Sequence, residues 1–418
     1  MTDIAGLATR RAALTMLDAV LRRGDALDQV EARACRHLEL PEDKAMARAI
    51  AAETLRHMVD LDALIDARTR QPLADDAKAR TVLRMMLAQA LVLKTPAHAV
   101  VATGLELLSG GPRRLAHGVF GALMRGDPAL PEKPTLPETV AQRWRDHWGD
   151  AMVEAASIGL AKAPPIDITL RDPETAAHPG GTELIPGHIR LSESGPVPAM
   201  PGYAEGAWWV QNISAALPAR LLGNGAGRSV YDLCAAPGGK TMQLAVKGWQ
   251  VTALDLSEKR NRRLSENLER TGLAANIITM DALRWQPEAQ ADAVLLDAPC
   301  TATGIFRRHP DVLHRISERD IADRAQLQAK MLEQAAAWLK PGGHLLYAVC
   351  SLEPEEGEAQ IGQFLDAHSD FLINAVTPDE LPDGLSPTDE GYVRILPHHL
   401  AELGGMDGFF IARMQREN

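Results

Sequence analysis

Residues 232–241 read Asp-Leu-Cys-Ala-Ala-Pro-Gly-Gly-Lys-Thr and lie at the end of an apolar stretch. A Gly-rich turn between a strand and a helix lets a ligand approach the backbone closely and meet the helix N-terminus. Strand-like and helix-like stretches then alternate along the chain, which predicts an α/β fold with a doubly wound parallel sheet and helices on both faces. The strand-like stretches are 229–235, 250–256, 291–299 and 343–351, and the helix-like ones are 257–272 and 318–339.

The first third of the chain has a different pattern. Over residues 1–126 Ala, Leu and Arg dominate, Pro is scarce and apolar residues recur at helical spacing. Between Arg84 and Leu93 the apolar character surrounds the helix, which predicts a central buried helix. We expect an all-helical domain here, followed at 127–138 by a linker that its prolines make semi-rigid.

Two further segments complete the expected organisation. Residues 139–210 begin with a helix and continue with short strand-like pieces broken by Gly and Pro, which predicts a small α+β subdomain. Residues 211–418 hold the doubly wound sheet. Within them, 375–407 is acidic and rich in Pro and Gly, so we expect loop there before a last strand at 408–414.

Composition and charge limit the classes of protein to consider. The 418 residues contain no apolar run near the roughly 20 needed to cross a bilayer, and the N-terminus lacks the apolar core of a secretory signal. We therefore expect a cytoplasmic protein with no membrane partner. The net charge of −11 argues weakly against nucleic acid, but residues 1–130 carry 18 Lys and Arg against 16 Asp and Glu. Local basic clusters, not the global charge, decide RNA binding.

The cysteines are Cys35, Cys234, Cys300 and Cys350. They form no CxxC pair and no His stands at a zinc-like spacing, so we expect no metal site. So few cysteines in so long a chain also argue against a disulfide framework. Each is by default a small buried hydrophobe, and only its local context can indicate chemistry.

Two kinds of nucleotide site compete for the Gly-rich turn. A P-loop would need Gly where Cys234 stands, so that pattern fails by one residue. A site for S-adenosylmethionine needs an acid at the end of the next strand to hold the ribose hydroxyls, and Asp255 stands there, 16 residues after Gly239. Such an acid can instead cap the following helix, but the turn and the acid occur together in the right order. Asp281 ends a third strand, where it could accept from an adenine amino group or simply cap a helix.

Two thiols and a carboxylate follow later strands. Asp297 and Cys300 end one strand in the sequence Asp-Ala-Pro-Cys, and Cys350 closes another. The carboxyl ends of parallel strands share one edge of the sheet, where ligands bind in open α/β folds. One strand-end Cys is easily accidental, whereas two beside a predicted cofactor turn are much less so.

A compact basic cluster, Arg307, Arg308 and His309, lies downstream of the first thiol. Such a cluster is suited to an RNA phosphate, although two adjacent arginines are more often a solvated loop run. We expect these residues to contact RNA.

Paired thiols suit one particular chemistry. Carbon 5 of cytosine is too weak a nucleophile to attack a methyl sulfonium directly, but a thiolate that adds to carbon 6 makes a covalent enamine that can. The proton on carbon 5 must then leave and the thiolate must be expelled, which requires a general base. An acid such as Asp297 can hydrogen-bond the ring nitrogen or the exocyclic amine and stabilise the adduct.

These motifs resemble those of the RsmB/NOP family of RNA 5-methylcytosine methyltransferases. The resemblance covers about residues 205–418, and the helical residues before them resemble the NusB-like RNA-binding domain fused to RsmB-type members. The motifs are QN-x-S at 211–214, DLCAAPGGKT at 232–241, LLDAPC at 295–300, the TG…RRHPD run at 303–311 and the Cys-Ser strand end at 350–351.

The resemblance implies a Rossmann-like methyltransferase domain that uses S-adenosylmethionine to methylate carbon 5 of a cytosine in RNA, small-subunit (16S) rRNA first of all. It implies that Cys350 is the nucleophile, that Cys300 assists release of the product and that Asp297 acts beside them. We expect a monomer. The implied cofactor residues are Cys234, Ala235, Ala236, Pro237, Gly238, Gly239, Lys240, Asp255, Asp281 and Asp297.

The chain departs from the family pattern at three places. Val349 stands where a Thr usually precedes the nucleophile, and Thr301 stands where a Ser usually follows Cys300. In the helical domain, HGVFGALMR at 117–125 replaces a common Asn-Ala-Val-Leu-Arg ending. The last departure bears on the RNA contacts of the helical domain and not on the catalytic class.

Other functions remain to be weighed against this one. In DNA cytosine methyltransferases the Cys of a Pro-Cys pair is the nucleophile, which would give that role to Cys300. The same chemistry on tRNA or on another rRNA cytosine is a closer alternative. A non-catalytic RNA-binding or ribosome-assembly factor would be favoured if either thiol were missing. Under the favoured hypothesis the target base must leave its stack, and the helical domain and residues 164–210 grip the RNA.

Overall fold

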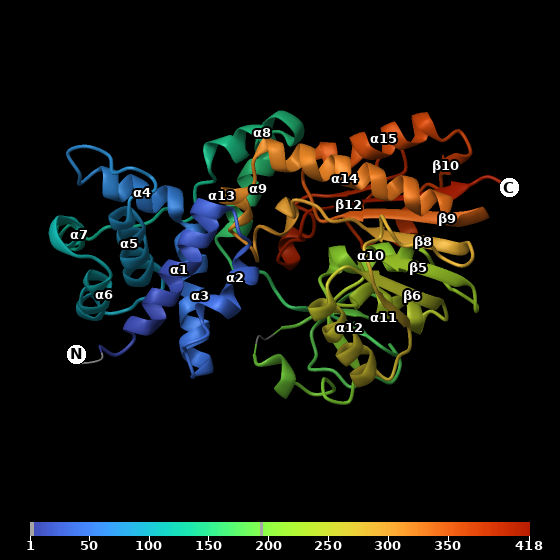
Figure 1. Ribbon diagram of the computed structural model, residues 1–418, viewed down its shortest axis with the longest axis horizontal. Coiled ribbons are helices and arrows are strands. Elements are labelled where there is room, and N and C mark those ends of the chain that lie inside the picture. The colour runs from blue at the N-terminus through green and yellow to red at the C-terminus, as the bar shows by residue number, and fades with distance from the viewer. Residues whose placement is uncertain (1–3, 193–194) are drawn as a thin grey trace. The chain divides into compact units, whose positions relative to one another are not determined.

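The boundary between the two units of the structure falls at Ala163, beyond the linker expected at 127–138. The computed structural model describes residues 4–192 and 195–418 (Figure 1). The first unit comprises the described residues up to Ala163 together with Phe306–Ile316, and the second comprises Pro164–Ile305 and Ser317–Asn418. The helices expected at the start of the α+β subdomain therefore belong to the helical unit, and so does a short segment from the C-terminal half.

The first unit packs its helices around α5. Residues Ala79 to Leu87 of this helix are all buried, which confirms the central buried helix predicted from the sequence. Arg84 on α5 remains buried because Asp62 lies 2.7 Å from its guanidinium. The helices of the unit are α1 (Leu7–Arg23), α2 (Leu27–Ala34), α3 (Pro41–Arg56), α4 (Met58–Asp66), α5 (Lys78–Leu87, continued by a π-turn at Ala88–Val92), α6 (Ala97–Gly104), α7 (Gly110–Arg125), α8 (Glu138–Trp148), α9 (Asp150–Leu160) and α13 (Val312–Arg315).

Phe306–Ile316 is built into the core of this helical unit. The Phe306 ring lies 5.4 Å from the Trp144 ring of α8, and both side chains are fully buried. Asp311 accepts a hydrogen bond from the Leu27 backbone at 3.3 Å. The His314 imidazole meets the Leu55 carbonyl at 2.7 Å. The segment therefore contributes packing and hydrogen bonds that α1–α9 alone would lack.

The second unit begins with a small antiparallel sheet in the order β2-β3-β1-β4. Ile168, Ile189 and Trp208 form its apolar core. A buried ion pair joins two of the strands, since Arg190 donates to Asp167 at 2.7 Å. These strands confirm the β part of the expected α+β subdomain. They are β1 (Asp167–Leu170), β2 (Thr182–Ile185), β3 (His188–Arg190) and β4 (Trp208–Val210).

The larger sheet of this unit is the predicted doubly wound sheet. Its order is β7-β6-β5-β8-β9-β12-β10, with β5 to β9 parallel and β12 inserted antiparallel between β9 and β10. The strands are β5 (Ser229–Leu233), β6 (Gln250–Asp255), β7 (Asn276–Thr279), β8 (Ala291–Asp297), β9 (Leu339–Val349), β10 (Phe371–Ile373), β11 (Val393–Ile395) and β12 (Phe409–Arg416).

Helices cover both faces of this sheet, as Figure 1 shows. Alternate strand residues explain why: Val294 and Leu296 pack toward α14 and α15, whereas Ala293 and Leu295 pack toward α10 and α11. The helices are α10 (Ile213–Leu221), α11 (Gly239–Val246), α12 (Glu258–Thr271), α14 (Glu318–Ala337) and α15 (Glu358–Ala367). No helix in the described part of the chain is long and apolar enough to cross a membrane.

One strand was missed in the acidic stretch at 375–407. β11 pairs antiparallel with β12, and its three residues are all buried. The flanking chain is loop with short 3-10 turns, as expected. The strand is too short to show an alternating pattern, and its Pro- and Gly-rich surroundings hide it. The 3-10 turns among the described residues are Leu105–Leu107, Val197–Ala199, Thr303–Ile305, Pro354–Glu356, Pro378–Glu380 and Ala401–Leu403.

Burial of His314 predicts a loss of stability in acid. Burial lowers the pKa of His314 to about 4. The unfolded chain takes up this proton near pH 6.5 and the folded chain does not, so stability present at pH 7.5 is lost as the pH falls toward 4. We expect His314→Gln, which keeps an N–H donor for the Leu55 carbonyl, to reduce the loss between pH 7.5 and pH 5 by about 2 kcal/mol.

Urea unfolding followed by circular dichroism at both pH values measures this difference. His98→Gln is the control, because His98 is an exposed histidine of the same unit. An unchanged pH dependence in His314→Gln would show that the buried imidazole does not control the acid response.

Candidate active site

The Gly-rich turn lies at the point where the sheet reverses its strand order. β5 has β6 on one side and β8 on the other, and ligands bind outside the carboxyl ends of the strands at such a switch point. Cys234 and Gly238 in the turn have left-handed backbones, with φ of 62° and 102°. A Cβ on Gly238 would lie 3.0 Å from the Leu264 side chain, so the turn packs closely against α12. Cys234 is largely buried within it, and burial raises the pKa of its thiol.

A buried acid anchors each side of the turn. Asp232, at the end of β5, accepts from the Thr241 hydroxyl at 2.5 Å, and complete burial raises the pKa of Asp232 to about 7. Asp255, at the end of β6, accepts from the backbone N–H of Ala236 at 3.2 Å and from that of Ser257 at 2.9 Å. Asp255 therefore holds the turn in place and fixes the backbone of Ser257, whose own hydroxyl caps α12, so the capping role that the sequence left open belongs to Ser257. A carboxylate has further lone pairs, so ribose binding stays a prediction.

Asp281 lies just beyond β7, beside β6. It accepts from the Leu283 backbone N–H at 3.0 Å, and its side chain is about 40% exposed. It occupies the expected strand end and can be reached from solvent. Its contact with adenine stays a prediction.

Lys240 joins the Gly-rich turn to the end of β8. Its ammonium group, on the first turn of α11, lies 2.7 Å from the Asp297 carboxylate and 5.5 Å from the centre of the Phe409 ring. Lys240 is almost buried, while about a third of the Asp297 side chain is exposed. The pair therefore places a partly exposed carboxylate, bound to a neighbouring cation, at the end of β8.

The two strand-end thiols meet. Cys300 and Cys350 lie beyond the neighbouring parallel strands β8 and β9, and their sulfur atoms are 3.4 Å apart. The hydrogen bond to Cys350, together with burial, raises the pKa of the Cys300 thiol well above its usual value. Cys300 therefore keeps its proton at neutral pH and can donate it in a hydrogen bond to the Cys350 sulfur.

Sequence reasoning missed the carboxylate that organises both thiol loops. Glu356 is fully buried and accepts from the Thr301 backbone N–H at 2.9 Å, the Ser351 hydroxyl at 2.5 Å and the Gln328 amide at 2.8 Å. It also accepts from the Thr301 hydroxyl. Burial raises the pKa of Glu356, although all these donors favour its ionised form. The available signal was an acid-rich turn immediately after Cys350.

The basic cluster lies in the helical unit and is partly or fully buried there. Arg307 is only 4% exposed within the helical unit, where it packs against Gly159 of α9. Its backbone carbonyl accepts from Arg56 at 3.1 Å. Arg308 is partly buried, and the His309 ring lies 3.4 Å from the Asp28 carboxylate. Arg307 is thus buried because its neighbour Phe306 packs into an apolar core, and contact of Arg307, Arg308 and His309 with RNA stays a prediction.

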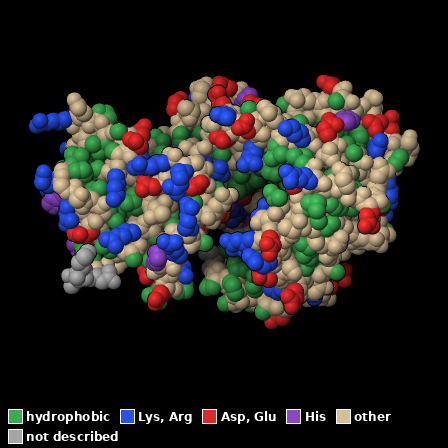
Figure 2. Space-filling view, viewed as in Figure 1, with side chains coloured by type: hydrophobic (Ala, Val, Ile, Leu, Met, Phe, Trp, Pro, Cys, Tyr) green, Lys and Arg blue, Asp and Glu red, His purple; other side chains and the backbone are tan. Residues whose placement is uncertain are grey.

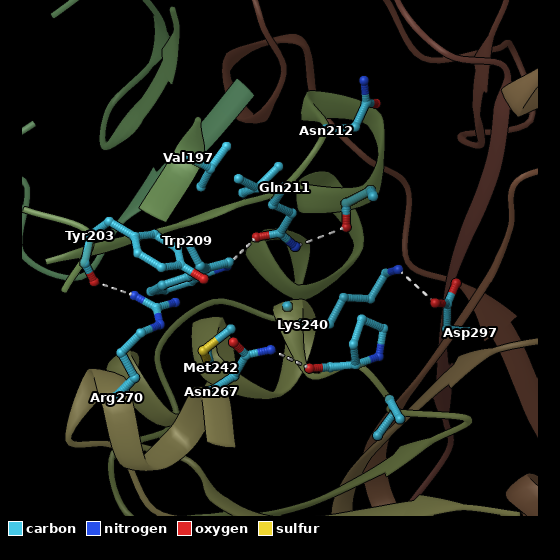
Figure 3. A pocket seen from close by; sticks show the side chains of 16 residues that line it. Val197, Tyr203, Trp209, Gln211, Asn212, Lys240, Met242, Asn267, Arg270 and Asp297 are labelled. Atoms are coloured by element: carbon cyan, nitrogen blue, oxygen red, sulfur yellow. Dashed lines mark hydrogen bonds and ion pairs between the residues drawn. The ribbon is translucent and has the colours of Figure 1, made fainter. Parts of the chain in front are cut away.

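A cavity of about 330 Å³ opens beside the Lys240–Asp297 pair, as Figure 3 shows. Tyr203, Trp209 and Arg270 lie at its other end. Trp209 lies on β4, Tyr203 lies in the turn before β4, and Arg270 lies on α12. None of the three was predicted from the sequence to be a site residue. Elsewhere in the described residues, no three His, Cys, Asp or Glu side chains gather as metal ligands would.

Comparison with known proteins places the chain in a family. The family model for 16S rRNA methyltransferase RsmB/F matches residues 219–415, and the NusB family model matches residues 7–114. A Xanthomonas campestris protein named ribosomal RNA small subunit methyltransferase B is 33% identical over 88% of this chain and 90% of its own length. A Klebsiella pneumoniae protein of the same name is 33% identical over 97% of both chains.

The chain belongs to the RsmB/F family of 16S rRNA methyltransferases. Solved structures agree on the fold. The crystal structure of PH0851 covers 99% of both chains with a TM-score of 0.75 at 24% identity. That of NSun6 from Pyrococcus horikoshii with SFG covers 68% of this chain and 99% of its own, with a TM-score of 0.56 at 18% identity.

The methyl donor of this family is S-adenosylmethionine, and the residues at the switch point fit it. The turn at 234–240 has no room for side chains at its glycines, since a Cβ on Gly239 would lie 3.3 Å from the Gln211 side chain. The backbone can therefore approach a ligand closely. Acids stand at the ends of the next two strands, as a ribose and an adenine amino group would require.

Substitution of Glu356 should slow methyl transfer without weakening cofactor binding. Glu356→Gln turns one carboxylate oxygen into a donor that faces the Thr301 and Gln328 donors, so both thiol loops must shift. A displacement of about 1 Å at a reacting group can cost on the order of 100-fold in rate. We expect kcat to fall by about that factor while the Kd for S-adenosylmethionine stays within about twofold, because Glu356 contacts no residue of the turn.

Single-turnover methylation and calorimetric titration of the cofactor separate these two effects. Glu355→Gln is the matched control, since Glu355 is the exposed neighbouring residue. Full turnover by a folded Glu356→Gln would rule out the positioning role.

Proposed function

We propose that this chain methylates carbon 5 of a cytosine in 16S rRNA through a covalent bond between Cys350 and carbon 6 of the base. The single observation that carries the proposal is the pair of thiols at the ends of β8 and β9, 3.4 Å apart. The family assignment supplies the reaction class, and the names of the relatives point to small-subunit rRNA. No simple methyl transfer to a nitrogen or oxygen would need two cysteines at this edge.

The difference between the two thiols supports Cys350 as the nucleophile. The raised pKa keeps Cys300 protonated, which makes it a poor nucleophile and a good hydrogen-bond donor. The Cys300 S–H lies within hydrogen-bonding distance of the Cys350 sulfur, so it can stabilise negative charge on the attacking thiol. This assignment agrees with the RNA enzymes and not with the DNA-type arrangement, in which the Cys of the Pro-Cys pair attacks.

The chemical steps use groups that already lie together. The Cys350 thiolate forms a bond to carbon 6, and the ring electrons move toward carbon 5. Asp297, which Lys240 holds in place through an ion pair, accepts a hydrogen bond from the exocyclic amine and orients the base. When bound, the cofactor supplies the electrophilic methyl group that carbon 5 accepts.

Release of the product reverses the addition. The proton on carbon 5 passes to a base at the site, the double bond between carbons 5 and 6 re-forms, and the Cys350–carbon 6 bond breaks. Cys300 assists because its S–H can donate to the departing Cys350 sulfur, which lies 3.4 Å from it in the free protein. Without Cys300 the thiolate leaves more slowly, so the covalent adduct accumulates.

Substitution of each thiol tests these roles. We expect Cys350→Ala to abolish both methyl transfer and the denaturation-stable protein–RNA adduct. We expect Cys300→Ala to retain attack and to accumulate adduct, with multiple turnover reduced by about 100-fold, the lower end of the range typical of loss of one acid–base group. Cys35→Ala should behave as wild type, because Cys35 lies in the helical unit.

The assay uses full-length protein, S-adenosylmethionine and a 16S rRNA transcript. Denaturing gels report the adduct, and mass spectrometry of nuclease digests locates the methyl group. Adduct from Cys350→Ala and none from Cys300→Ala would reverse the two roles. Methylation of a tRNA transcript in preference to 16S rRNA would change the substrate and leave the chemistry intact.

A further inference from the structure

We propose that the cavity beside Lys240 and Asp297 binds the nucleotide that adjoins the target cytosine in the RNA strand. This inference rests on the proposed function, because it assumes that the target base lies at the thiols. It assigns a role to residues outside the catalytic and cofactor motifs, chiefly Tyr203, Arg270 and Asn267. Figure 3 shows the residues that line this cavity.

The cavity adjoins the catalytic site. Lys240 and Asp297 line one end of it, and Asp297 begins the short loop that leads to Cys300. A ligand in the cavity therefore lies next to whatever occupies the catalytic site. Asp255 and Asp281, the acids expected to hold the adenosine part of the cofactor, are not among the lining residues. Ala235, Ala236, Pro237 and Gly239 of the Gly-rich turn do line it, so the cavity adjoins the turn but not the expected ribose and adenine contacts.

The shape and apolar lining suit a flat base. Trp209, Met242 and Val197 line the cavity, and its volume lies near the lower end of the range of about 300–1,000 Å³ typical of small-ligand sites. At the end away from Asp297, the Arg270 guanidinium lies over the Tyr203 ring at 4.1 Å from its centre. Aromatic rings and guanidinium planes are the surfaces on which unstacked RNA bases stack.

The charge of the cavity suits an anionic ligand. Lys240 is neutralised by Asp297, so Arg270 supplies the unbalanced charge. Arg270 donates to the carbonyls of Tyr203 at 2.7 Å and Trp208 at 3.0 Å, and no carboxylate of the described residues lies within ion-pair distance of it. Partial burial lowers the pKa of Arg270, but a guanidinium stays charged at neutral pH. A fixed, half-buried cation without a carboxylate partner is suited to an RNA phosphate.

Two amide side chains that line the cavity, Gln211 and Asn267, differ in whether they can still hydrogen-bond a ligand. Gln211 is committed to the protein: its carbonyl oxygen accepts from Thr169 and Trp209, and its amide donates to Gln243. Asn267 donates to the Pro237 carbonyl at 3.0 Å, which leaves its carbonyl oxygen as an acceptor toward the cavity. Stacking and charge thus provide most of the binding, and one amide contacts the base edge.

Two changes test the proposal in combination: a larger side chain that fills the cavity, and an RNA substrate that lacks the neighbouring base. Ala215 lines the cavity from α10, so Ala215→Leu narrows it with a residue that helices accept. The substrates are short oligoribonucleotides that contain the target cytosine, either intact or abasic at one neighbouring position. We expect wild type to lose about tenfold in kcat/KM on the RNA that lacks the bound base, the effect typical of one stacked base.

The variant should respond differently to the same two substrates. Ala215→Leu should lose about tenfold on the intact RNA and nothing further on the abasic RNA, because the base no longer has a site. Equal losses on the abasic RNA in wild type and variant would overturn the proposal. A weaker Kd for S-adenosylmethionine with unchanged RNA kinetics would also overturn it, because the cavity would then belong to the cofactor.

Substitution of Arg270 provides a second test, which does not depend on filling the cavity. Arg270→Met should reduce the slope of log Kd against log salt for single-stranded RNA by about 0.7, the loss of one phosphate contact. Arg228→Met is the matched control. Arg228 likewise lies over an aromatic ring, that of Trp249, and donates to two backbone carbonyls, but it precedes β5 at the opposite edge of the sheet. Equal slopes in the two variants would overturn the phosphate contact.

The design separates this inference from the proposed function. RNA binding is measured by fluorescence anisotropy without cofactor, and methyl transfer is measured separately on the same oligonucleotides. If wild type methylates no cytosine, the proposed function fails, and the anisotropy comparison of intact and abasic RNA still decides whether a base enters the cavity. If methylation proceeds and Ala215→Leu does not alter it, the cavity proposal alone fails.

Discussion

Glu356 buries a carboxylate between the two loops that carry the thiols, and the geometry of the catalytic edge depends on it. Parallel pairing fixes β8 against β9 only as far as Asp297 opposite Ala348. Beyond that point the regular ladder between the strands ends, and the backbone joins the two thiol loops through a hydrogen bond from Gly304 to the Cys350 carbonyl at 3.0 Å. Glu356 replaces the ladder by accepting from Thr301 and Ser351, the residues that directly follow the two thiols. A buried carboxylate is costly, so it is retained only where its donors are numerous and fixed.

Lys240 performs a similar task between the turn and the sheet. It lies at the start of α11, where the Gly-rich turn ends, and its ion pair reaches across the switch point to Asp297. Movement of the turn therefore changes the electrostatic environment of the acid that faces the base. The Gln211 network supports the same region from the opposite side, because Gln211 bonds to Gln243 of α11 as well as to β1 and β4. The wall of the cavity and the cofactor turn are in this way parts of one hydrogen-bonded frame.

The sequence was sufficient for features that follow from local pattern and parallel pairing. Alternating strands and helices predicted the doubly wound sheet, and the rule that carboxyl ends share one edge brought Cys300 and Cys350 together. Glu356 was not predictable in this way. Its partners Thr301 and Gln328 stand 55 and 28 residues away, and no periodicity links them. β11 was not predicted from the sequence because three residues are too few to show a strand pattern.

The basic cluster shows that the composition of a motif does not determine its surroundings. Arg307, Arg308 and His309 have the composition of a phosphate site, but Phe306 beside them packs on Trp144, a residue 162 positions earlier. Because α13 and its neighbours complete the helical core, that unit cannot reach its full packing until residue 316 has been synthesised. Contacts of such long sequence separation form late and slowly. A fragment that ends at Ala163 would expose the surfaces that Phe306 and His314 cover, so the limit of the helical unit is set by these contacts and not by the linker.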